Sequence, residues 1–183
     1  DAAGRPWATL LEGRPGFIRS PTSRKLRIDA TWGADDPARA KTTPGERGGV
    51  GLLGIELPTR RRNRANGLLS AVAGALELDV VQSFGNCPQY IQAREFKWVR
   101  DAADLQPRAT EALSALDADA RALIQRSDTL FIATQAPAAA DGADVATGRG
   151  ADVSHRGGRP GFVKIEDDRT FLVPDFTGNF FFM

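Results

Sequence analysis

The chain has 183 residues, of which 42% are hydrophobic and 26% are charged, and its formal net charge is +1. These values are ordinary for a globular protein with a sizeable core, and the near-neutral charge argues against a protein that wraps nucleic acid. One cysteine and one histidine exclude an internal disulfide and leave too few ligands for a zinc site. Because neither a membrane-length apolar stretch nor a secretory signal is visible, we expect a cytoplasmic protein that binds neither membrane nor nucleic acid.

The first half of the chain is predicted to consist mainly of strands separated by loops. Residues 25–29 ("KLRID") alternate apolar and polar side chains, as in a half-buried strand. The polar stretch 31–48 is rich in proline and glycine, which predicts a loop. Residues 50–57 ("VGLLGIEL") are almost continuously apolar over the length of one strand. We therefore predict that 50–57 is a strand buried on both faces.

Arginines cluster directly after that strand. A turn is expected at Pro58, and the basic residues that follow it are Arg60, Arg61, Arg62 and Arg64. Guanidinium groups suit phosphate oxygens, so one interpretation of this group is a phosphate clamp; the other is a solvated hairpin tip. The Asn66-Gly67 pair that comes next is a strong signal for a hairpin turn.

The pattern then changes from strand to helix and back to strand. Residues 76–80 alternate apolar and acidic side chains, which predicts a half-exposed strand. Between about 104 and 127 leucines fall at helical spacings, Pro107 suits a first helical position, and Asp117 is the expected N-cap of a second helical piece. Residues 129–134 ("TLFIAT") again read as a strand.

Two parts of the chain repeat each other. "GRPGFI" at 13–18 matches "GRPGFV" at 158–163, an offset of 145 residues that also pairs the strands at 25–29 and 170–175. In each copy glycine and proline turn the chain, and a phenylalanine with a β-branched residue leads out, which predicts a reused β-hairpin unit. Each copy lacks strands that the other has, so we expect a second protomer, the other copy or further sequence to supply them.

The second copy carries the polar triplet Ser154-His155-Arg156 where the first copy has residues 9–11 ("TLL"). On a strand, Ser154 and Arg156 point to one face and His155 to the other. Serine and arginine beside a glycine turn suit a phosphate or a polar ring edge. The alternative is an edge strand with a solvated arginine and a surface histidine.

Several blocks of the sequence together resemble one family. They are "GVGLLGIELPTRRRNRANG", "QSFGNCPQYIQ", "DTLFIAT", "ADVSHRGGRPGFVKI" and "VPDFTGNFFFM". They resemble the successive blocks of the flavin-nucleotide-binding proteins related to pyridoxamine 5'-phosphate oxidase, over most of the chain from Gly4 to Met183. The segments 85–92 and 152–162 are the most specific parts of this resemblance.

The resemblance implies a mainly β (α+β) fold, a split β-barrel of the FMN-binding type built from tandem units with a short helical connector. Residues 1–103 are then a first, N-terminally incomplete unit with a structural role, and 104–127 are the connector. Residues 128–183 are a second, C-terminally incomplete unit with the flavin site. Members of the family are usually homodimers that hold FMN at the dimer interface.

The resemblance also implies which residues bind the cofactor. These are Ser154, His155, Arg156 and Asn179. Arg156 is expected to meet the flavin phosphate, Ser154 and Asn179 to supply polar contacts, and His155 to face the substrate; no metal is expected. The implied function is an FMN-dependent oxidoreductase that uses NAD(P)H or a small-molecule substrate. The alternatives are a non-catalytic flavin-binding or stress-related protein and a structural split-barrel dimer without cofactor.

Overall fold

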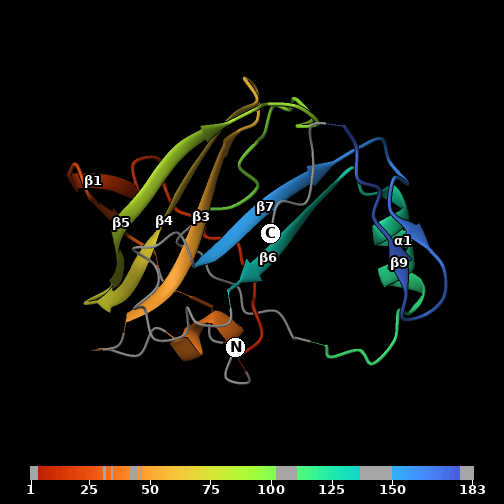
Figure 1. The fold of residues 1–183 in the computed structure, drawn as a ribbon, viewed down its shortest axis with the longest axis horizontal. Helices are drawn as coiled ribbons and strands as arrows, with labels where there is room; N and C mark the ends of the chain where they lie inside the picture. Colours follow the sequence, from red (N-terminus) through yellow and green to blue (C-terminus); the bar gives the residue numbers. More distant parts are fainter. Residues whose placement is uncertain are drawn as a thin grey trace.

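A computed structural model describes residues 4–30, 32–33, 35–41, 45, 47–101, 111–136 and 150–177 (Figure 1). In this part of the chain the fold is mainly β, with antiparallel sheets and one α-helix. The predicted β-rich class is therefore confirmed. The described part of the chain holds no helix with the length and apolar character that crossing a membrane requires.

The elements follow the chain in this order: β1 (Ile18–Thr22), β2 (Lys25–Ile28), the 3-10 helix η1 (Pro37–Lys41), β3 (Arg47–Glu56), β4 (Arg61–Val72), β5 (Ala75–Asn86), α1 (Ala118–Arg126), β6 (Thr129–Gln135), β7 (Ala151–Gly157), β8 (Lys164–Ile165) and β9 (Phe171–Leu172).

Five strands form the main sheet, in the order β1-β2-β5-β4-β3. Its antiparallel register places Leu78 opposite both Leu26 and Leu69, so these side chains share one face. Ile28 and Leu76 join Leu69 and Leu78 as the buried core on that face. The order ends on β1 and β3, so within the described residues this sheet stays open rather than closing into a barrel.

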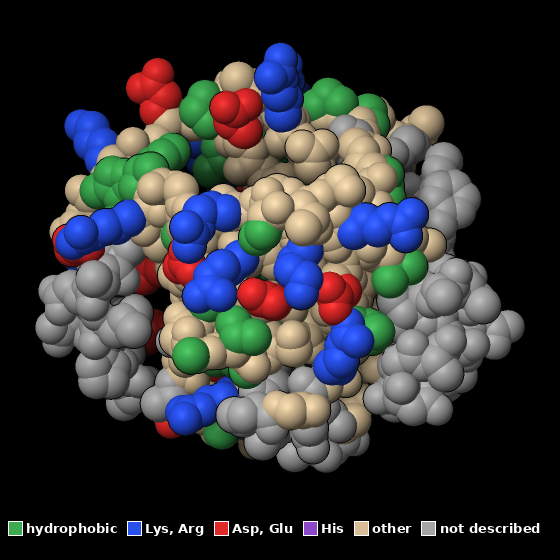
Figure 2. Space-filling model, turned by 90° about the vertical axis from the view of Figure 1, so that its left-hand side faces the viewer, with side chains coloured by type: hydrophobic (Ala, Val, Ile, Leu, Met, Phe, Trp, Pro, Cys, Tyr) green, Lys and Arg blue, Asp and Glu red, His purple; other side chains and the backbone are tan. Residues whose placement is uncertain are grey.

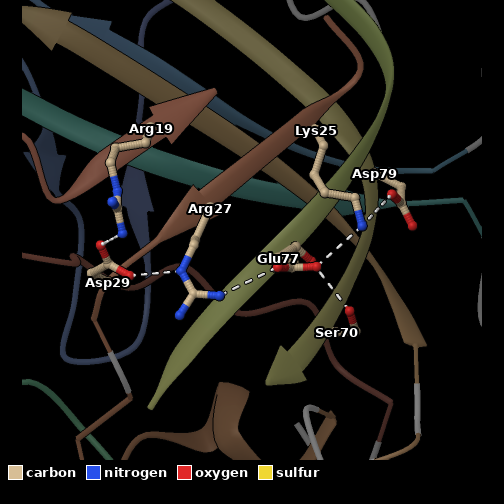
Figure 3. A network of polar contacts seen from close by, with 7 residues as sticks. All are labelled: Arg19, Lys25, Arg27, Asp29, Ser70, Glu77 and Asp79. Atoms are coloured by element: carbon tan, nitrogen blue, oxygen red, sulfur yellow. Dashed lines mark hydrogen bonds and ion pairs between the residues drawn. The ribbon is translucent and has the colours of Figure 1, made fainter. Parts of the chain in front are cut away.

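The opposite face of the main sheet carries a matched set of charges at its β1–β2 end (Figure 3). Its members are Arg19, Lys25, Arg27, Asp29, Glu77 and Asp79. Each base in this set has an acidic partner, and the side of the molecule on which β1 lies shows basic and acidic groups interspersed (Figure 2). We regard this network as a solvated sheet face, where each ion pair contributes little to stability.

The β6–β7 hairpin packs against the other end of this face, beside β3 and β4 (Figure 1). The approach is closest at Gly51 of β3, where an added Cβ would lie 2.8 Å from the Cα of Asp152 in β7. Only glycine allows two backbones to come this near, because any side chain would separate them. Gly51 therefore fixes where β7 crosses the sheet.

The repeat predicted from the sequence is present in the structure. In the first copy Arg19 pairs with Arg27 across β1 and β2, and in the second Lys164 pairs with Leu172 across β8 and β9, which is the same register shifted by 145 residues. Gly16 (φ 89°) and Gly161 (φ 82°) both occupy the left-handed position of the preceding turn. The two copies therefore share this strand pair and the turn before it, which glycine accommodates easily, although β1–β2 is longer than β8–β9.

Two predictions about β3 and β4 are wrong. Asn66-Gly67 is no hairpin turn: both residues lie inside β4, and the chain reverses at Leu57–Arg60 instead. The glycine serves a close approach, since a Cβ on Gly67 would lie 2.0 Å from the carbonyl oxygen of Asp79, next to a bulge in the β4–β5 register. β3 is also an edge strand with half-buried side chains, not a strand buried on both faces.

Of the helical segment expected at 104–127, the structure shows an α-helix only at its end, as α1. Asp117 caps α1, and its side chain accepts a hydrogen bond from the backbone N–H of Ala120, as its type and position indicate. Residues 111–117 are not helical, so the apparent periodicity there was misleading. Residues 102–110, including Pro107, lie outside the described part of the chain.

Candidate anion-binding site

The predicted polar strand exists and is held from two sides. β7 pairs along its length with β6, which sets Ile132 opposite Ser154 and Phe131 opposite His155. Ser154 therefore shares a face with Asp152 and Arg156, and this face meets β4. His155 points to the other face of β7, where its ring meets Phe131 edge-on with 5.8 Å between ring centroids.

Arg64 of β4 joins the two strands at the centre of the site. One terminal nitrogen donates to Asp152 Oδ2 at 3.0 Å and the other to Ser154 Oγ at 2.8 Å. Asn66 Nδ2 also donates to Asp152, at 3.4 Å. The side chain of Arg64 is only 13% exposed, and its Nε is buried with no hydrogen-bond partner in the described residues.

Two further arginines lie beside Arg64. Arg156 is 7% exposed, and Arg62 is partly buried with one terminal nitrogen donating to the carbonyl oxygen of Cys87 at 2.8 Å. Burial lowers the pKa of both guanidinium groups, and the positive charge of Arg64 lowers each of them further. The three cations therefore lie close enough to repel one another.

The charges in this cluster are not matched as they are in the sheet-face network. Asp152 is the ion-pair partner of Arg64, and Asp175 and Asp152 oppose part of the charge of Arg156. Arg62 has no carboxylate partner among the described residues, and its buried Nε makes no hydrogen bond there. A half-buried cation without a counter-ion is costly, which makes this a place where an anion would be stabilised.

His155 is buried in an uncharged state. It is 2% exposed, and its Nδ1 has no hydrogen-bond partner within the described structure. Burial lowers its pKa to about 4, and the positive charges of Arg62 and Arg156 act in the same direction. At neutral pH the ring therefore adds no positive charge to the neighbouring arginine cluster.

The loop that follows β5 packs against the end of β7 and fixes its position. Gln92 Nε2 donates to the carbonyl oxygen of Gly158 at 2.9 Å. A Cβ on Gly157 would lie 2.1 Å from the carbonyl oxygen of Tyr90, so this residue too must be glycine. The two segments that carry the most specific resemblance, 85–92 and 152–162, are thus packed on one another.

The structure brings together part of the predicted cofactor set. Ser154 and Arg156 lie on the face that meets β4, whereas His155 lies on the other face of the same strand. Asn179 lies outside the described residues. The alternative of a solvated arginine and a surface histidine is wrong, because both side chains are buried.

Arg62 and Arg64 are not in the predicted cofactor set, although the structure places them in one cluster with Arg156. The arginine group was expected in a turn, but only Arg60 is there, and Arg62 and Arg64 lie on β4 with their side chains partly buried. The spacing of two residues between them was the available signal, since it places both on the same face of a strand. No local pattern marks Arg61 as the start of β4.

Comparisons with protein families, with characterised proteins and with solved structures find no match to this chain.

Proposed function

We propose that this protein is an FMN-binding flavoprotein of the split-barrel type and that the arginine cluster, Arg62, Arg64 and Arg156, holds the phosphate of the flavin nucleotide. The observation that carries the proposal is Arg62, a partly buried guanidinium that has no carboxylate partner in the described residues and lies beside two other cations. A phosphate dianion supplies the missing negative charge and several acceptor oxygens.

The donors present in the site suit a phosphate. The Nε atoms of Arg62 and Arg64 are buried donors without a partner within the described structure. Ser154 Oγ already accepts a hydrogen bond from Arg64, so its own proton is available for a phosphate oxygen. Asp152 holds Arg64 in place and limits the net positive charge, which keeps the cluster stable before a ligand binds.

When bound, FMN supplies hydride or electron transfer, and the protein positions the ring. We expect the activity to be that of an oxidoreductase related to pyridoxamine 5'-phosphate oxidase, with NAD(P)H or a small molecule as its partner. Arg62, Arg64 and Arg156 orient the cofactor in this proposal, and neutral His155 adds no charge on the other face of the strand. The resemblance in the sequence supports this assignment of the anion.

We also propose that the tandem hairpins belong to two split-barrel units and that the protein is a homodimer. The matching register of β1–β2 and β8–β9 supports duplication of one unit. Phe84 of β5 and Phe131 of β6 are 40% and 44% exposed, which leaves apolar side chains on two strands for contact with another chain.

Titration of the protein with FMN, followed by quenching of flavin fluorescence, tests the phosphate site. We expect saturable binding that Arg62→Gln and Arg156→Ala each weaken by about tenfold or more, because each removes a charge-assisted hydrogen bond. Arg126→Ala in the last turn of α1 is the matched control and should leave the affinity unchanged. Equal affinities in all four proteins would overturn the proposed site.

A further inference from the structure

A pocket of about 530 Å³ lies beside the turn that follows β7. The residues that line it are Tyr90, Gly158, Arg159, Pro160, Gly161, Phe162 and Phe176. Its walls are mostly aromatic rings and glycine backbone, and Tyr90 and Phe176 contact each other with 5.3 Å between ring centroids. This volume suits a small molecule, and the flat walls favour a planar one.

The wall formed by Tyr90 is held in an unusual backbone conformation. Tyr90 has a φ of 66°, in the left-handed region that a residue with a bulky side chain rarely adopts. Its hydroxyl donates to the carbonyl oxygen of Thr177 at 2.9 Å, and its own carbonyl is packed against Gly157. Such strain persists only where the surroundings enforce it, and it is concentrated at ligand sites.

In the first copy of the repeated turn, the arginine equivalent to Arg159 pairs with a carboxylate. Arg14 occupies in the first copy the place that Arg159 has in the second, and Phe17 and Phe162 donate to the carbonyl oxygens of these arginines at 3.0 Å. Arg14 Nε donates to Asp101 Oδ1 at 3.1 Å, and its terminal nitrogen reaches the other oxygen of that carboxylate at 2.5 Å.

Arg159 has no such carboxylate. Among the described residues it makes no side-chain ion pair, it is exposed, and it lines the pocket. The same turn thus places one guanidinium on an exposed carboxylate of the chain and presents the other, unpaired among the described residues, to a cavity with aromatic walls. The fork of a guanidinium matches a carboxylate with two parallel hydrogen bonds.

We infer that this pocket binds a small planar aromatic carboxylate, whose ring lies against Tyr90, Phe162 and Phe176 and whose carboxylate pairs with Arg159. The ligand carboxylate pairs with Arg159 as the carboxylate of Asp101 pairs with Arg14. This site is separate from the proposed phosphate site, and it does not depend on whether the protein binds FMN.

Calorimetric titration with 2-naphthoate, a planar aromatic carboxylate, tests the inference on the purified full chain. We expect saturable binding of one molecule per chain and no measurable binding of the neutral analogue naphthalene-2-carboxamide. Arg159→Ala should weaken 2-naphthoate by about tenfold or more. Arg24→Ala, a matched loss of an exposed arginine in the turn between β1 and β2, should have no effect.

Two further measurements distinguish this pocket from the phosphate site and from nonspecific adsorption. Phe176→Leu should weaken 2-naphthoate while far-UV circular dichroism stays the same, because it removes one ring wall and keeps an apolar side chain. Saturating FMN should leave the affinity for 2-naphthoate unchanged. Binding that is unsaturable, that survives Arg159→Ala intact, or that FMN displaces competitively would each overturn the inference of a separate carboxylate site.

Discussion

His155 makes the stability of the folded protein depend on pH. Its pKa is lowered from 6.5 to about 4 in the folded protein, chiefly by burial. Above about pH 6.5 the ring is neutral in both the folded and the unfolded chain and has no effect on stability. As the pH falls below that value, His155 becomes protonated in the unfolded chain but stays neutral in the folded protein. This difference in proton binding destabilises the folded protein.

We predict that between about pH 7 and about pH 5 the free energy of unfolding falls by about 2 kcal/mol because of His155 alone. Urea denaturation at the two pH values measures the change. His155→Leu, which installs the residue found at the matching position of the first copy, should remove this part of the pH dependence. An identical loss in the variant and the parent would show that His155 is not buried in its neutral form.

Anion binding should be visible at the same histidine. The positive charges of Arg62 and Arg156 help to hold the pKa of His155 down, so a bound phosphate that offsets them should raise it. The chain has one histidine, which makes its ring-proton resonances unambiguous in an NMR pH titration. We expect an upward shift of the pKa when FMN is added, and no shift with riboflavin, which lacks the phosphate. A pKa that FMN leaves unchanged would place the phosphate elsewhere.

The contact between β3 and β7 rests on one glycine. Gly51→Ala would set a Cβ 2.8 Å from the Cα of Asp152, and backbone there cannot move aside without separating the strands. We predict a loss of about 1–3 kcal/mol in the free energy of unfolding, the usual cost of overpacking. Gly54→Ala in the same strand is the control, because nothing lies within 4 Å of its added Cβ. Thermal or urea unfolding of both variants makes the comparison, and equal stabilities would contradict the close crossing.

Sequence patterns predicted the elements whose signals are local. The strand expected at 129–134, which is β6, the cap at Asp117 and the repeated glycine turns each depend on residues within a few positions of one another. Asn66-Gly67 was misread because a glycine required by a neighbouring strand looks in the sequence like a glycine required by a turn. The position of β3 at an edge also could not be predicted, since it depends on which strands pair.

In the candidate site, too, the features that depend on local sequence could be predicted and those that depend on distant segments could not. The alternation of Ser154 and Arg156 along one strand could be predicted, and their common face follows from it. The position of Arg64 beside β7 could not be predicted, because it depends on a contact between segments 90 residues apart in the chain. Burial of His155 likewise arises from the β6 strand and the loop after β5, which no local pattern reveals.

At the scale of the whole molecule we propose a homodimer. Light scattering coupled to size-exclusion chromatography should give twice the mass of one chain, because the family that the sequence resembles holds its flavin between two protomers. Phe131→Glu on β6 should shift the distribution toward single chains if that exposed side chain lies in the interface. A well-folded parent protein that stays monomeric at high concentration would contradict the dimer.

The central claim is that the arginine cluster is a binding site for flavin nucleotide. Equilibrium dialysis of the purified protein against FMN and against riboflavin, with bound flavin read from its absorbance at about 450 nm, tests it most directly. The account predicts one FMN per chain and much weaker retention of riboflavin, because Arg62, Arg64 and Arg156 act on the phosphate. Failure to retain FMN, or equal retention of the two flavins, would contradict it.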